Sequence, residues 1–137
     1  MWITPKTNWE PTDFITYVDY NRMVTNLNHI KGIFDTLYPP IYWRQLTTKA
    51  EGDDIYASDF NSITDMLNSL NVESVNTDIG NTQSYKANGY TIAYTDLNRI
   101  ESGMLKLKTM LLSQYQTLPH LAIKLGDKTF NVGREEI

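Results

Sequence analysis

The segment Tyr94–Leu112, YTDLNRIESGMLKLKTMLL, decides the fold of this 137-residue chain. Apolar residues recur in it at intervals of three and four positions, namely Leu97, Ile100, Met104, Leu107 and Leu111. Residues three and four apart share one face of an α-helix, so the spacing predicts an amphipathic helix. The apolar face of such a helix needs cover from other parts of the molecule.

The same spacing occurs twice earlier in the chain. It comprises Tyr20, Met23, Leu27, Ile30, Phe34 and Leu37 in the first copy, and Phe60, Ile63, Leu67 and Leu70 in the second. Each copy starts with an Asp-x-Asn triplet, and the aspartates Asp19, Asp59 and Asp96 are 40 and then 37 residues apart. We therefore predict three copies of one helix with its lead-in, over residues 19–37, 58–71 and 95–116.

The Asp-x-Asn triplets suit helix starts. An aspartate at the first helical position complements the helix dipole, and an asparagine at the third can hydrogen-bond back toward the cap. Ser58 and Thr95 are the expected N-caps of the second and third copies. Val18 cannot cap the first, so Asp19 or Thr16 is expected to take that role. A metal-site or binding-site interpretation of the triplets is less favoured.

The connections are long. Residues 1–16 hold two prolines and two tryptophans, which predicts an extended arm whose tryptophans pack on the chain's own helices or dock on another subunit. The two later connections, about 20 residues each, can bring the chain back along a helix of about 27 Å. That length allows parallel helices, although antiparallel neighbours are the commoner arrangement.

Pro119 is expected to end the third helix, and Gly126-Asp127 matches a two-residue hairpin turn. The predicted fold class is therefore mainly α: a three-helix bundle-like core with long connections, an N-terminal extended arm and a C-terminal β-hairpin. One domain, 1–137, comprises the arm (1–16), three helix repeats (17–117) and the hairpin with its tail (118–137).

Composition excludes several kinds of chemistry. The chain has no cysteine, which rules out disulfides, cysteine-ligated metals and a thiol nucleophile, and its net charge of −4 argues against nucleic-acid binding. His29 and His120 lack metal-ligand spacing, and the acidic pairs are expected to be solvated. We assign no catalytic, cofactor-binding or metal-binding residues and predict a protein that is not an enzyme. It has no expected membrane span or signal peptide, which indicates a cytoplasmic protein.

The candidate interface residues are large apolar side chains. Leu105 and Leu112 widen the apolar face of the third helix, so that helix is either the centre of the bundle or a face for another subunit. Trp2 and Trp9 on the arm and Trp43 in the first long connection complete the set. A homo-oligomer is one expected outcome, but each helix carries only two or three heptads, which favours an intramolecular bundle over a coiled-coil dimer.

Two stretches resemble a known group of proteins. WITPKTNW at residues 2–9, DYNR at 19–22 and TDLNRIE at 95–101 look like small proteins from the tail and host-adsorption modules of siphophages that infect Gram-positive bacteria, Bacillus siphophages among them. The resemblance covers residues 1–37 and 90–112. The middle copy departs from it, because residues 61–64 read NSIT and lack both the arginine and the glutamate.

The resemblance implies a viral protein with a structural or adsorption-related role in the tail or baseplate, acting through contacts with other phage proteins or with itself. It would lie in the host cytoplasm during assembly or in the virion tail. The alternative is a non-virion accessory factor, such as an assembly helper or a host-directed binding protein. Host surface glycan binding and cell-wall hydrolysis are less favoured.

Overall fold

The computed structural model describes residues 1–80, 85 and 92–127, with the backbone alone for residues 118–127. It contains three helices, α1 (Tyr17–Leu37), α2 (Ala57–Val72) and α3 (Tyr94–Asp127), and no strand within the described ranges. The prediction of a mainly helical chain with three helices is therefore confirmed.

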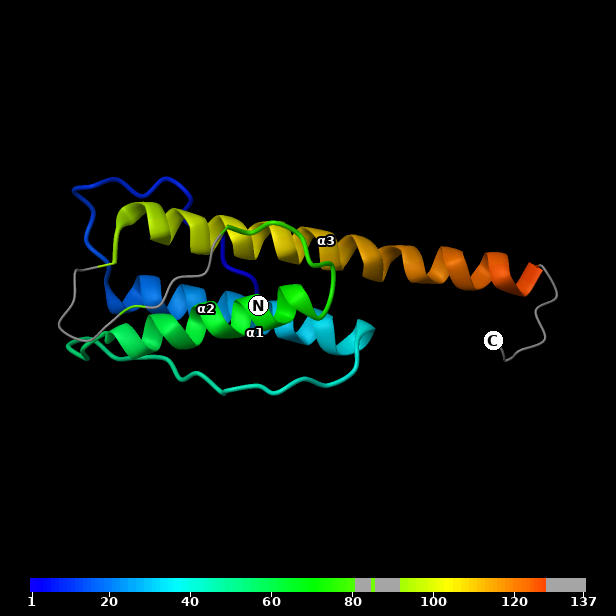
Figure 1. Ribbon diagram of the computed structural model, residues 1–137, viewed down its shortest axis with the longest axis horizontal. Helices are drawn as coiled ribbons and strands as arrows, with labels where there is room; N and C mark the ends of the chain where they lie inside the picture. Colours follow the sequence, from blue (N-terminus) through cyan, green and yellow to red (C-terminus); the bar gives the residue numbers. More distant parts are fainter. Residues whose placement is uncertain (81–84, 86–91, 128–137) are drawn as a thin grey trace.

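The three helices run parallel. Figure 1 shows their N-terminal ends together at one end of the molecule, with the long connection after α1 returning along the outside of the bundle. Each helix packs against both of the others. The sequence left the direction of packing open, and the structure decides for the parallel arrangement, which the long connections make feasible.

The core consists of the three predicted apolar faces. Residues at equivalent places in the repeat are buried together, and Tyr20 meets Phe60 edge-on at a centroid distance of 6.4 Å at the N-terminal end. The next residues along the three faces are less than 6% exposed: Met23, Ile63, Ile100, Leu27, Leu67, Met104, Ile30, Leu70 and Leu107. Burial of these side chains supplies the main driving force for folding.

Helix starts differ from the prediction by one or two residues. Thr16 caps α1, and the carboxylate of Asp19 accepts from the Thr16 backbone N–H at 2.9 Å. In α2, Asp59 accepts in the same way from the Tyr56 N–H at 2.7 Å, so Ser58 is not the cap. The aspartate therefore stands at the third helical position, because from there its carboxylate reaches back to the cap. Likewise α3 begins at Tyr94, so Thr95 is not its N-cap.

Replacing Thr16 with Ala is expected to lower the free energy of unfolding by about 1 kcal/mol, because the first turn of α1 loses its side-chain cap. Urea unfolding followed by circular dichroism measures this loss. Ser58→Ala is the matched control, since Ser58 lies inside α2, and a control effect as large as the Thr16 effect would contradict the assignment of the caps.

The asparagines of the repeat were predicted to hydrogen-bond back toward the caps, and this prediction is wrong. They hold the connections between the helices instead. Asn21 accepts from the N–H of Lys49 at 2.7 Å and donates to its carbonyl at 2.8 Å. Asn61 makes the same pair of bonds to Tyr85, both at 2.7 Å. A side-chain amide carries a donor and an acceptor side by side, so it can pair with a backbone as a neighbouring strand would.

The third asparagine closes the cycle. Asn98 of α3 accepts from the N–H of Trp9 at 2.6 Å and donates to its carbonyl at 3.1 Å. Thus α1 holds the segment that precedes α2, α2 holds the segment that precedes α3, and α3 holds the arm that precedes α1. The three repeats therefore form a closed, approximately threefold arrangement, with an extended segment in each groove.

The same type of turn occurs in two of the extended segments. Directly after the clamped residue, the N–H of Asp13 donates to the carbonyl of Glu10, whose own N–H donates to the Asp13 carboxylate. Asp53 and Ala50 form the same two bonds. The repeat thus extends beyond the helix to the chain that leads into it.

The C-terminal end of α3 lies beyond its predicted limit. The helical backbone continues through Pro119 to Asp127, so the predicted end near Gln116 is wrong. The sequence spacing explains why helix is compatible there, since Leu118, Leu121 and Leu125 prolong the three-four pattern. The second strand of the predicted hairpin falls within residues 128–137, outside the described residues, so the hairpin as a whole is not tested.

Candidate functional site

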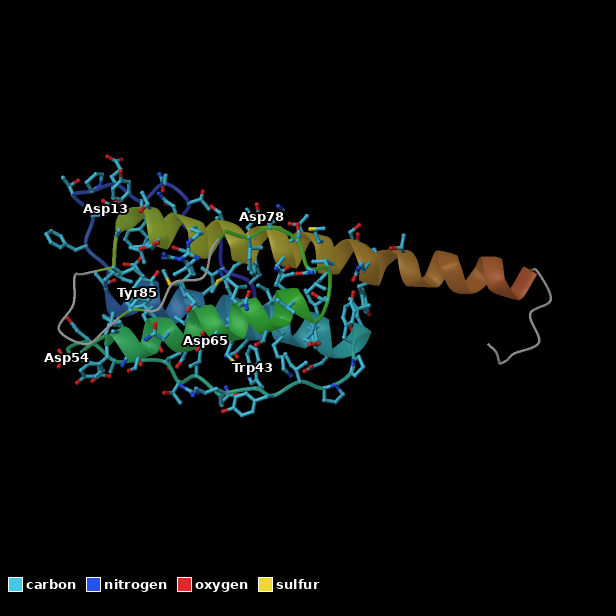
Figure 2. The ribbon with its side chains drawn as sticks, in the orientation of Figure 1. Asp13, Trp43, Asp54, Asp65, Asp78 and Tyr85 are labelled. Atoms are coloured by element: carbon cyan, nitrogen blue, oxygen red, sulfur yellow. The ribbon has the colours of Figure 1, made fainter. Side chains whose placement is uncertain are left out.

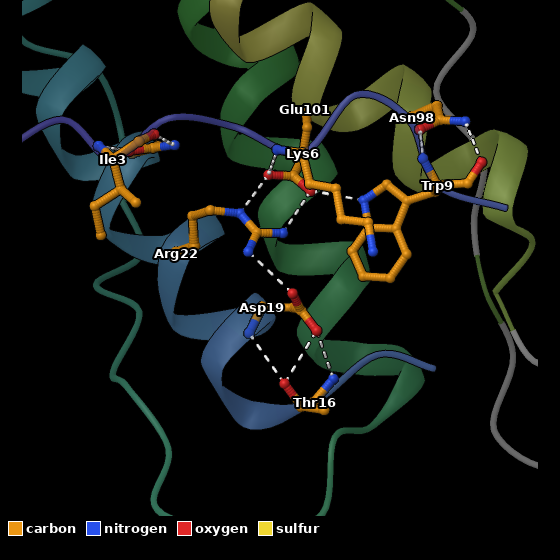
Figure 3. Close-up of polar contacts among 9 residues, drawn as sticks. Ile3, Lys6, Trp9, Thr16, Asp19, Arg22, Asn98 and Glu101 are labelled. Atoms are coloured by element: carbon orange, nitrogen blue, oxygen red, sulfur yellow. Dashed lines mark hydrogen bonds and ion pairs between the residues drawn. The ribbon is translucent and has the colours of Figure 1, made fainter. Parts of the chain in front are cut away.

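A buried carboxylate holds the N-terminal arm. Glu101 of α3 is 0% exposed and accepts hydrogen bonds from three residues, two on the arm and one on α1, as Figure 3 shows. The Trp9 indole N–H donates to its Oε2 at 2.7 Å, and the Lys6 backbone N–H donates to its Oε1 at 3.1 Å. Arg22 of α1 donates from Nε and Nη2 to the two carboxylate oxygens at 2.7 and 2.8 Å.

The charges in this cluster are matched. Hydrogen bonds from Arg22 to Glu101 and then to Asp19 raise the pKa of Arg22 above its ordinary value, against the effect of burial. A two-point guanidinium–carboxylate pair is strong and directional. Since both oxygens of Glu101 accept hydrogen bonds from the arm and from Arg22, the carboxylate holds the arm against α1 and α3.

The cluster breaks the internal threefold pattern. Glu101 stands five residues after its aspartate, where α1 has Val24 and α2 has Thr64. Arg22, three residues after Asp19, corresponds to Ser62 in α2 and to Arg99 in α3. It is therefore the glutamate, replaced by Val24 and Thr64 in the other helices, that distinguishes the groove between α1 and α3, and this groove receives the arm.

The five candidate interface residues lie in different surroundings. Trp9 is 2% exposed and packs on the chain's own helices, so it is not a free contact residue. Trp2 and Trp43 are partly buried against the core, Trp43 on the connection after α1 (Figure 2). Leu105 is 38% exposed, whereas Leu112 is half-buried and borders a cavity.

That cavity is the apolar concave site next to the end of the arm. It has a volume of about 340 Å³ and lies between the C-terminal half of α1 and α3, lined by Asn28, His29, Gly32, Ile33, Thr36, Leu112 and Tyr115. The Trp2 ring lies 5.7 Å from the His29 ring, so the arm reaches the border of the cavity. Burial, followed by the positive charges of the N-terminus and Lys108, lowers the pKa of His29.

A second exposed feature is the distal part of α3. This helix has 34 residues, against 21 in α1 and 16 in α2, and Figure 1 shows it projecting beyond both partners. Among its described side chains Leu105, Met110 and Tyr115 are 38%, 36% and 49% exposed. Large apolar side chains on an uncovered helix surface are typical of contact sites for other proteins.

Other chemistry finds no support in the described part of the chain. No cluster of three or more potential metal ligands occurs there. None of the helices that the structure describes combines the length and apolarity needed to cross a bilayer. Comparison with protein-family models, with curated proteins and with solved structures finds no match.

Sequence reasoning missed the two features that hold the arm. The Asp-x-Asn repeat signalled that the asparagines matter, but their partners lie 24 to 89 residues away. Glu101 stood out only as the last residue of the motif TDLNRIE and was given no structural role. The available signal was that glutamate takes the place of valine and threonine in the repeat.

Proposed function

We propose that the chain is a non-enzymatic protein of a phage tail or baseplate module that works through protein–protein contacts. The observation that carries the proposal is α3, which carries the exposed large apolar side chains of Leu105, Met110 and Tyr115 beside α1 and then projects past the other helices. The resemblance of residues 2–9 and 95–101 to tail-module proteins supplies the phage context.

The rest of the structure fits a scaffold. The polar residues inside the bundle are hydrogen-bonded to the chain's own backbone and side chains, as Asn26 is to Ile3 and Asn71 to Thr77. Such interior groups stabilise one arrangement of arm and helices. The rigid bundle then presents α3 to its partner in a fixed direction.

Mass spectrometry of purified virions of the phage that encodes the chain tests this proposal. We expect peptides of the chain in a fixed ratio to other tail proteins. Their absence from particles, together with recovery of the chain bound to a phage or host protein in infected cells, supports the accessory-factor alternative instead.

A double variant tests the contact surface. Leu105→Glu with Met110→Glu is expected to leave the helical circular dichroism unchanged, because both side chains are already more than one third exposed. We expect its incorporation into particles to fall at least about tenfold, since like charges and lost apolar contact disfavour docking. Asn68→Glu on α2 is the control, since Asn68 is exposed, and equal losses in both variants would contradict a contact specific to α3.

A further inference from the structure

The groove between α1 and α3 is only partly filled. Residues 3–9 of the arm run along it, held at Ile3 by Asn26, at Lys6 by Glu101 and at Trp9 by Asn98. Beyond Trp2, toward the C-terminal ends of the helices, the same groove widens into the apolar cavity lined by Gly32, Ile33, Leu112 and Tyr115.

The two equivalent grooves are occupied by the chain itself. After α1 the chain turns back, Tyr38 stacks on Phe34 at 5.1 Å, and Ile41 packs against the core. After α2 the chain also turns back, and Val75 and Ile79 pack against the core while the Asp78 carbonyl accepts from Lys106 at 2.7 Å. In both cases an extended segment with apolar side chains covers the groove.

The open groove follows from the length of α3. Because α3 continues straight on to Asp127, no returning segment covers its groove with α1 within residues 1–80, 85 and 92–127, the part of the chain that the structure describes. The arm covers only the part nearest the helix N-termini. The cavity therefore lies where the other two grooves hold an extended segment, and no such segment lies there among the described residues.

We propose that this cavity binds an extended apolar segment of a partner protein, which continues the line of the arm and runs antiparallel to α1 and α3. The repeat indicates its chemistry: the segment at the equivalent place beside α1 is Tyr38-Pro39-Pro40-Ile41, in which Tyr38 and Ile41 pack against the core and the two prolines are exposed. The partner therefore offers a short extended stretch of proline, aromatic and aliphatic residues, which enters the groove with little loss of conformational entropy.

Charge near the arm specifies the end of this segment. In the antiparallel direction the C-terminal end of the bound segment meets Trp2, where Lys108 Nζ lies 4.9 Å from the ring centre. Lys108 also acts electrostatically on His29 at the cavity border. A carboxylate at the C-terminal end of the segment complements the positive charge of Lys108.

The test uses the full-length chain and a four-residue peptide, YPPI, that carries fluorescein at its N-terminus and copies residues 38–41. We expect saturable binding in fluorescence anisotropy with a Kd below about 1 mM. The peptide with a free C-terminal carboxylate is expected to bind about two- to fivefold more tightly than its C-terminal amide at low salt.

Gly32 offers a matched pair of variants. A Cβ added at Gly32 meets no atom within 4 Å, so substitution there does not clash with the folded chain. Gly32→Leu fills the cavity and is expected to weaken peptide binding at least about tenfold, while Gly32→Ala leaves most of the space and keeps binding within about twofold. Both variants replace a helix-interior glycine, so neither is expected to lower the melting temperature.

Two results of the peptide assay overturn the proposal: no binding at about 5 mM peptide, or equal binding to the Gly32→Leu variant and the unchanged chain. Self-association of the purified chain that Gly32→Leu abolishes also overturns it, because the groove then binds a second copy of the chain. Binding of an apolar dye without binding of the peptide assigns it to small molecules. The inference rests on the proposed function, since it names one contact of a partner-binding protein. The assay needs no virion, so its failure is distinct from absence of the chain from particles.

Discussion

Replacing Glu101 with Ala is expected to lower the free energy of unfolding by about 3–5 kcal/mol, the usual cost of removing one member of a buried ion pair. The substitution leaves the Arg22 guanidinium, whose side chain is only 12% exposed, without its carboxylate. It also leaves the Trp9 indole N–H and the Lys6 N–H without an acceptor. Urea unfolding followed by circular dichroism measures the loss.

The internal repeat supplies a control for this prediction. The double variant Arg22→Ser with Glu101→Thr copies the residues of α2 at both places. It is expected to be at least about 1 kcal/mol more stable than Glu101→Thr alone, because the unpaired buried charge is gone. Asp35→Ala breaks the exposed pair with Lys31 and is expected to cost at most about 1 kcal/mol. A Glu101→Ala effect as small as that of Asp35→Ala sinks the idea that the pair holds the arm.

Replacing Asn98 with Ala is expected to lower the free energy of unfolding by about 2–3 kcal/mol. Both backbone groups of Trp9 lose their partner at once, and each partly buried unsatisfied group costs about 1 kcal/mol or more. The arm is also expected to loosen, so the quantum yield and emission wavelength of tryptophan fluorescence change as Trp9 leaves its buried place.

Two further substitutions separate the clamp from a general effect on α3. Asn98→Asp keeps the acceptor for the Trp9 N–H but removes the donor to the Trp9 carbonyl, so an intermediate loss is expected. Asn68→Ala removes an exposed asparagine from α2 and is expected to change stability by less than about 0.5 kcal/mol. Equal effects of Asn98→Ala and Asn68→Ala show that the clamp contributes nothing.

The helices were predictable because their signal is local. A spacing of three and four apolar residues fixes which side of a helix is buried, whatever it packs against. Met23, Ile63 and Ile100 are each 0% exposed, as that rule requires. The caps were predicted to within two residues, and the error came from placing the aspartate at the first helical position when it acts from the third.

The site was less predictable because its contacts are distant in sequence. Asn98 and Trp9 are 89 residues apart, and Glu101 and Arg22 are 79 residues apart. No local pattern links such residues. The five apolar candidates could not be sorted from sequence either, since Trp9 became core, Leu112 a cavity wall and Leu105 an exposed residue.

The sequence by itself determined that the chain forms three amphipathic helices and which side of each helix is buried, because helical periodicity depends only on residues close together in the sequence. Only the tertiary structure decided that the helices run parallel, that the asparagines clamp the returning chain, and that the arm lies in part of the groove between α1 and α3. The reason is that the apolar face of a helix determines which side is buried, but not which other helix or segment packs against it. Direction and pairing depend on hydrogen bonds that form once distant segments meet.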